Sequence, residues 1–243
     1  MASPRPANPY AAPRSRFFLG IALYALAVSL VGFAKTFFLP LATGQGSFHW
    51  IVMVHGAAFF AWMLLFTAQA ALIPAGRRQW HRRLGLASVP LALVMVASCI
   101  AVGALLARTE LAGRVENGGV DGFAGVVGAM VVFSLLYTAA LLQRQRPEVH
   151  KRLMFLATVA ILWPAWFRFR HYFPEVPRPE LSFGLLASDA VIAVAMLRDR
   201  LRFGRVHPVL LWVGTALFLE HVLELALFGT PAWRALSLWL LGA

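Results

Sequence analysis

Residues 17–42, FFLGIALYALAVSLVGFAKTFFLPLA, decide the fold of this chain. The stretch holds a single charged residue, Lys35, and exceeds the roughly 20 helical residues that cross the hydrocarbon core of a bilayer. It is also too long for the apolar core of a signal peptide. We therefore expect a membrane-spanning helix here, preceded by a disordered cytoplasmic tail over residues 1–15.

Six more apolar stretches follow, and they leave no segment long enough for a separate soluble domain. Backbone groups in lipid must be satisfied within a helix or a closed barrel, and the chain lacks the alternating pattern of a barrel. The sequence thus predicts an all-α integral membrane bundle of seven transmembrane helices, forming one domain over residues 16–243. The predicted spans are 17–41, 48–74, 84–107, 123–143, 152–173, 181–198 and 207–229.

Composition narrows the class of protein further. Hydrophobic residues make up 60% of the chain and charged residues 13%, which is typical of a protein dissolved in lipid. The net charge of +12 comes from short basic clusters between the apolar runs, so we expect no nucleic-acid partner. Because Cys99 is the single cysteine, the chain cannot form an internal disulfide or a thiolate metal cluster.

The distribution of Lys and Arg predicts the orientation, because cytoplasmic loops carry the excess. Fifteen lie in the tail and in the second, fourth and sixth connections: Arg5, Arg14, Arg16, Arg77, Arg78, Arg82, Arg83, Arg144, Arg146, Lys151, Arg152, Arg198, Arg200, Arg202 and Arg205. The other side holds six: Arg108, Arg114, Arg168, Arg170, Arg178 and Arg234. We expect a cytoplasmic N-terminus and a place in a bacterial inner membrane.

A basic motif with a central histidine repeats. RRQWHRRL (77–84) resembles RPEVHKRL (146–153), and RVHP (205–208) is a shorter third copy. These echoes suggest three similar helical hairpins after one extra helix. The alternative is that basic and histidine side chains at this edge anchor to anionic headgroups.

Ionisable side chains inside the predicted spans are the candidate functional residues, since such groups are costly in lipid. His55 and His221 each lie about eight residues, or roughly 12 Å, from the outer ends of their helices, and Asp189 lies at a similar depth. Glu220, His221 and Glu224 share one helix face. These polar groups converge on the outer half of the bilayer.

The first interpretation is a b-type haem with His55 and His221 as axial ligands. Arg168, Arg170 or His171 would then meet the propionates. A second haem using His207 with His81 or His150 is also conceivable, although the following Pro208 explains His207 as an ordinary helix start.

Two other interpretations use the same groups. His55, His221, Glu224, Glu220 and Asp189 can surround zinc, copper or iron, and a zinc ion would suit an intramembrane hydrolase. No H-E-x-x-H motif supports the hydrolase. Alternatively, these residues and Lys35 can form a proton-coupled transport pathway. Pro164 could then act as a hinge, because its missing N–H leaves the carbonyl of Ala160 without its helical hydrogen bond.

Other polar and aromatic residues in the spans have structural explanations. His49 and Trp50 are expected at the interface, and Lys35 is expected to snorkel outward or to pair with an acid. Trp62 and Gln69 are expected to pack or to bond between helices.

A family resemblance rests on His55 with Trp62 and Gln69, on WHRRLG (80–85) and on HKRLM (150–154). Through these motifs the second to fifth helices resemble a family of bacterial multi-pass membrane proteins for which we know no established activity. The scattered histidines are also similar to those of b-type haem membrane proteins and cytochrome oxidase assembly factors. We expect a redox protein that binds a haem or a metal through His55 and His221, with transport as the alternative. Because the chain lacks a long soluble domain, electrons or substrates would have to come from quinone, lipid or another protein.

Overall fold

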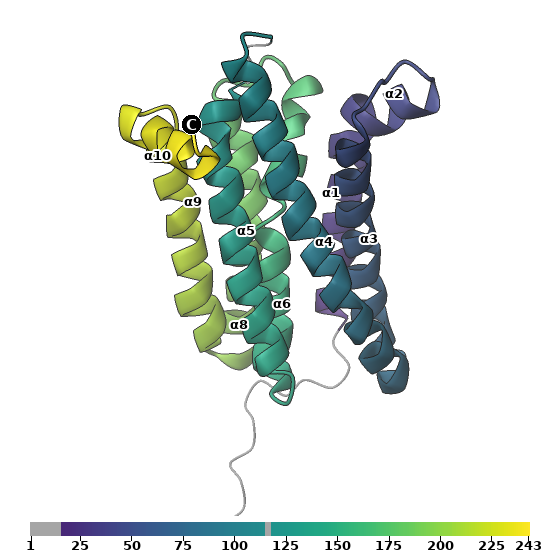
Figure 1. Ribbon diagram of the computed structural model, residues 1–243. Helices are drawn as coiled ribbons and strands as arrows, with labels where there is room; N and C mark the ends of the chain where they lie inside the picture. Colours follow the sequence, from purple (N-terminus) through teal and green to yellow (C-terminus); the bar gives the residue numbers. More distant parts are fainter. Residues whose placement is uncertain (1–15, 115–117) are drawn as a thin grey trace, which may run out of the picture.

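The computed structural model describes residues 16–114 and 118–243, and the predicted tail lies outside them. This part of the chain is all-α and contains seven helical segments that are long and apolar enough to cross a membrane, as predicted (Figure 1). The first three spans are α1 (Phe17–Phe33) continued by η1 (Ala34–Phe38) and α2 (Leu39–Ala42), then α3 (Trp50–Leu72) and α4 (Arg78–Leu111). The other four are α5 (Gly119–Leu142); α6 (Pro147–Val159) with α7 (Trp163–Phe167) and η2 (Arg168–His171); η3 (Glu180–Ala187) with α8 (Ser188–Phe203); and η4 (Val209–Gly214) with α9 (Thr215–Leu227).

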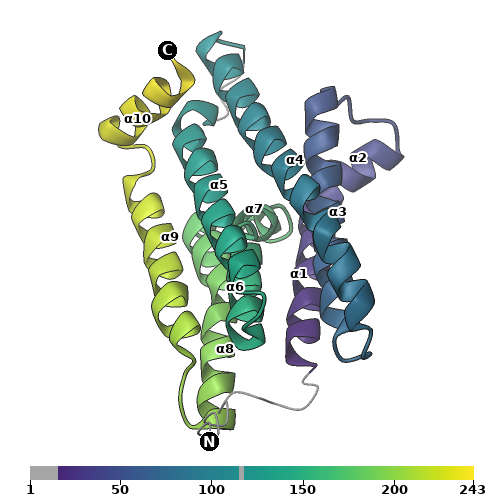
Figure 2. The same ribbon diagram turned by 60° about the horizontal axis from the view of Figure 1, so that its bottom comes forward.

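The spans form a bundle with two distinct ends. α4 packs along α3 and α5, α6 packs along α5, and α1 packs against α3 and α7. In both views α3 and α9 lie on opposite sides of the bundle, with α4 and α5 between them (Figures 1 and 2). We call the end where α1 begins the basic end, because Arg77, Arg82, Arg146 and Arg200 lie there; the chain finishes at the far end.

The most buried span is the broken one formed by α6 and α7. Its helix stops at Val159 and resumes at Trp163, one residue before Pro164, which confirms the predicted interruption. Phe155 and Leu156 are completely buried in the central core. The break lets the chain change direction inside the bundle while its apolar side chains stay packed.

A buried charge network holds the basic end together. The Arg152 guanidinium is fully buried and forms an ion pair of 2.7 Å with Asp199 of α8 and another of 2.7 Å with Glu148. Arg198 binds the second Asp199 oxygen at 2.8 Å. Arg152 therefore joins α6 to α8 in addition to contributing to the basic charge of this end.

At the far end, side chains tie η2 to the first span. Lys35 donates to the His171 carbonyl at 3.0 Å and lies over the Tyr172 ring, 4.2 Å from its centre. The Tyr172 hydroxyl donates to the Val31 carbonyl at 2.7 Å. Lys35 is exposed and contacts a carbonyl and an aromatic face, which agrees with outward snorkelling, the first of the two predictions, and no acid pairs with it among the described residues.

The last helix, α10 (Pro231–Leu241), was not predicted because it is too short to span a bilayer. Thr230 caps it by accepting from the Trp233 backbone N–H. It packs on α5, where the Ser237 hydroxyl accepts from the Ala124 N–H at 3.1 Å. The helix covers the end of α5 at the far end of the bundle (Figure 2).

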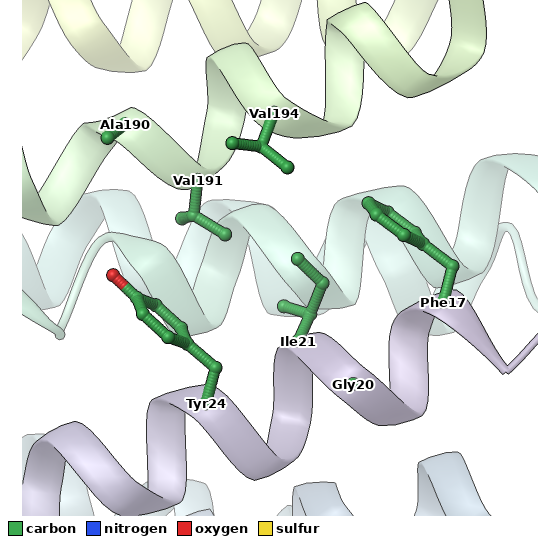
Figure 3. Close-up of a pocket in the computed structure, with 7 residues that line it drawn as sticks. All are labelled: Phe17, Gly20, Ile21, Tyr24, Ala190, Val191 and Val194. Carbon is green, nitrogen blue, oxygen red and sulfur yellow. The ribbon is translucent and has the colours of Figure 1, made fainter.

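A shallow apolar groove separates α1 from α8 (Figure 3). Its walls are Phe17, Gly20, Ile21, Tyr24, Ala190, Val191 and Val194. The Tyr24 hydroxyl accepts a hydrogen bond from Trp166 at 3.2 Å. The lining contains no charged side chain, and the Tyr24 hydroxyl is its one polar side-chain group.

Candidate functional site

The polar centre of the bundle lies where α8 meets α9. The Asp189 carboxylate and the His221 imidazole are both buried, and Asp189 Oδ2 lies 2.8 Å from His221 Nδ1. Because a carboxylate only accepts hydrogen bonds, Nδ1 is the donor and Nε2 of the neutral ring carries the lone pair. The second oxygen of Asp189 is buried and has no hydrogen-bond partner among the described residues. This pair confirms that the two residues share one level of the bundle.

Two more carboxylates extend the pair along α9. Glu220 Oε2 lies 3.7 Å from His221 Nε2, and the Glu224 side chain lies against Gly125 of α5. A methyl group at Gly125 would overlap the Glu224 carboxylate, so glycine provides the space that this acid occupies. We call Asp189, Glu220, His221 and Glu224 the carboxylate–histidine cluster.

The cluster carries an excess of acid within the membrane span. His221 lies six residues before the end of α9 at Leu227, a depth of about 9 Å. Among the described residues, no lysine or arginine forms an ion pair with these three carboxylates, and His221 is their one potentially cationic partner. Placing three carboxylates in a membrane span costs free energy unless they are protonated or bind a cation.

His55 lies apart from this cluster. Its ring packs on Phe59, with centroids 4.4 Å apart, and its buried Nδ1 has no hydrogen-bond partner in the part of the chain that the structure describes. His55 belongs to α3 and His221 to α9, and these helices lie on opposite sides of the bundle in both views (Figures 1 and 2). The arrangement gives no support to one haem iron bound by both residues.

The predicted propionate partners have contacts of their own. Arg168 donates to the Pro164 carbonyl at 2.8 Å and to the Thr36 hydroxyl at 3.2 Å, and it stacks over Phe33. The His171 side chain is exposed. Through its contacts with Thr36 and Phe33, Arg168 links η2 to the first span.

The predicted metal set is only partly assembled. Asp189, His221 and Glu220 come together, whereas the described residues contain no group of three or more His, Cys, Asp or Glu side chains arranged to hold a metal ion. A zinc, copper or iron site built from these residues remains a prediction.

The repeated motif produces a second polar feature, at the basic end. His81 Nδ1 lies 3.3 Å from the Gln69 carbonyl of α3, and His150 Nδ1 lies 2.8 Å from the Ala140 carbonyl of α5. Each histidine thus bonds back to the helix before its own, in the manner expected of equivalent hairpins. The sequence indicated both residues as possible partners of His207, but it gave no sign that they lie close to each other.

The third copy behaves differently. His207 Nδ1 accepts from the Val209 N–H at 3.1 Å, as a helix start before Pro208 requires. Burial and, next, the positive charge of Arg152 lower the pKa of His207 to about 4. The hydrogen bond to Val209 and the start of η4 at that residue agree with the interpretation of His207 as a helix start.

Comparisons of the chain with protein-family models, with curated proteins and with solved structures found no match. The class of protein therefore follows from the fold and the site alone: a multi-pass helical membrane protein with a carboxylate–histidine cluster buried toward one end of its bundle.

Proposed function

We propose that this chain is a channel-like membrane protein that conducts protons, with the carboxylate–histidine cluster as the proton-binding site. The observation that carries the proposal is the buried Asp189–His221 pair, extended by two further acids on α9 that form no ion pair with a lysine or arginine among the described residues. A His–carboxylate set can take up and release a proton without moving the backbone, which a proton relay requires.

The geometry suggests a path for the proton. The 3.7 Å between His221 Nε2 and Glu220 Oε2 is slightly beyond direct hydrogen-bond distance, so a small side-chain rotation or one water can connect them. Glu224 follows Glu220 by one helical turn toward the far end. Protons would pass from the far-end surface through Glu224 and Glu220 to His221 and Asp189.

The excess of Lys and Arg at the basic end supports a cytoplasmic location for that end. The cluster would then exchange protons with the outside of a bacterial inner membrane.

Proton flux into liposomes tests this function. We would reconstitute the purified chain with an entrapped pH-sensitive dye and impose a pH gradient and a membrane potential. The chain should acidify the lumen, and Asp189→Asn, His221→Gln and Glu224→Gln should each reduce the flux at least ~10-fold, as loss of an essential proton carrier does. Asp121→Asn, which removes a far-end carboxylate outside the cluster, should leave it unchanged.

A glycine pair provides a second, more conservative test. Gly125→Ala should displace the Glu224 carboxylate and reduce flux, whereas Gly122→Ala, one turn earlier on α5 with nothing near its added methyl, should not. Flux that is absent from the wild-type chain, or that is unchanged in the three cluster variants and in Gly125→Ala, would contradict the proposed function.

A further inference from the structure

The groove between α1 and α8 runs from the basic end into the membrane span (Figure 3). Phe17 and Val194 lie at one end of the groove, and Tyr24 and Ala190 lie at the other. Phe17 is the first residue of α1, so the groove begins where this span enters the hydrocarbon. From Phe17 to Tyr24 it extends roughly 10 Å along the helix, less than the ~15 Å of one leaflet. The groove therefore lies within the leaflet at the basic end.

The groove is open on the outer surface of the bundle. Its volume is about 430 Å³, which is within the ~300–1,000 Å³ of ligand sites. Gly20 and Val194 are exposed, and a methyl group added at Gly20 would meet nothing within 4 Å. The absence of a side chain at Gly20 thus keeps space open beside α8. Because the bilayer core holds no water, a lipid chain is the available molecule to fill this apolar space.

Positive charge gathers at the mouth of the groove. The Arg198 guanidinium lies over the Phe17 ring, 4.9 Å from its centre, and the Lys151 ammonium lies 5.3 Å from the ring centre of Phe18. Arg16 directly precedes Phe17 and is exposed. Among the described residues, the Arg16 side chain forms no hydrogen bond or ion pair. These cations surround the first turn of α1.

The acids at this end do not balance these cations. The charge network there holds three cations and two carboxylates: Lys151, Arg152, Arg198, Glu148 and Asp199. That leaves one positive charge in excess, and the arginine before α1 adds a second. Basic clusters at the membrane surface attract anionic lipid headgroups, whereas a lipid without net charge would leave this excess uncompensated.

We propose that the α1–α8 groove binds an anionic phospholipid from the leaflet at the basic end. One acyl chain lies between Gly20 and Val194, and the phosphate lies beside Arg16 and Arg198. The apolar wall and the positive mouth follow each other in the order in which such a lipid presents its chain and its headgroup. The site uses no residue of the carboxylate–histidine cluster and does not depend on the proposed proton conduction.

Native mass spectrometry of the delipidated full chain in detergent tests the headgroup contact. We would titrate the chain with phosphatidylglycerol and, separately, with phosphatidylcholine carrying the same acyl chains. One phosphatidylglycerol should bind at least ~10-fold more tightly, because each of the two excess charges favours an anionic lipid by about fivefold. Arg16→Gln should reduce this preference about fivefold. Arg114→Gln, which removes an exposed arginine at the far end, should leave it unchanged.

Filling the groove tests the position of the acyl chain. Gly20→Leu should abolish the tight binding of phosphatidylglycerol, whereas Gly122→Leu, at a glycine of α5 that also has open space around it, should not. Val194→Phe fills the groove from α8 and covers the case in which Gly20→Leu does not fold. Equal affinity for the two lipids would overturn the proposal. So would tight phosphatidylglycerol binding that persists in both filled variants, or dimers in place of bound lipid, which would make the groove a contact with a second copy of the chain.

Discussion

At the scale of single residues, the structure separates charges that hold the bundle together from charges that can react. Arg152 and Asp199 are both buried and fully paired, so their role is to join α6 to α8. Asp189 is also buried, yet one of its oxygens has no hydrogen-bond partner within residues 16–114 and 118–243. Leaving a buried oxygen without a hydrogen bond costs free energy, so Asp189 is a better candidate for a functional acid than Asp199.

The Arg152–Asp199 pair gives a prediction about stability. Asp199→Asn should remove the common partner of Arg152 and Arg198 and destabilise the fold by about 3–5 kcal/mol, because a guanidinium then stays buried with too little negative charge nearby. Thermal unfolding in detergent would show this as a markedly lower Tm.

The control is Glu180→Gln, which removes the carboxylate of the exposed Arg178–Glu180 pair, 3.5 Å apart. Exposed pairs contribute about 0–1 kcal/mol, so its Tm should stay close to that of the wild-type chain. Equal Tm values for the two variants would show that the buried network is dispensable.

At the scale of elements, small residues set how closely helices approach. A methyl group at Gly32 of α1 would overlap the backbone of Ala165 in α7, whereas one at Gly20 of the same helix meets nothing within 4 Å. Helix packing in membranes depends on such close contacts between backbones. The contact holds the broken span, and with it η2, against α1.

We therefore expect Gly32→Ala to force α1 away from α7, at a cost on the order of 1–3 kcal/mol for overpacking. Gly20→Ala should be neutral or slightly stabilising, since alanine favours a helix by up to about 1 kcal/mol over glycine. Tm values of both variants in the same detergent measure the difference. A Gly32→Ala chain as stable as Gly20→Ala would mean that the helices adjust freely.

At the scale of the whole molecule, orientation is the main expectation to test. With the basic end in the cytoplasm and seven spans, the C-terminus after α10 should lie outside. A C-terminal alkaline phosphatase fusion in a bacterial host should be active, and a C-terminal fluorescent-protein fusion should be dark. The reverse pattern would invert the orientation and place the carboxylate–histidine cluster nearer the cytoplasm.

The sequence by itself determined the helical class, the seven spans and the interruption at Pro164. Apolar run length and the demand of lipid for internal hydrogen bonding leave few other structures for such a chain. Residue spacing also placed Glu220, His221 and Glu224 on one face, because spacing along a helix is local geometry.

Only the tertiary structure decided which residues from different helices meet. Depth along each span made His55 and His221 look like partners, but depth does not specify the order of helices around a bundle, and these two helices lie on opposite sides. The pairing of His221 with Asp189, of Arg152 with Asp199, and of His81 with His150 depends on which spans pack together. That choice is made by side-chain packing along the full length of the helices, to which a single residue and its sequence neighbours contribute only a small part.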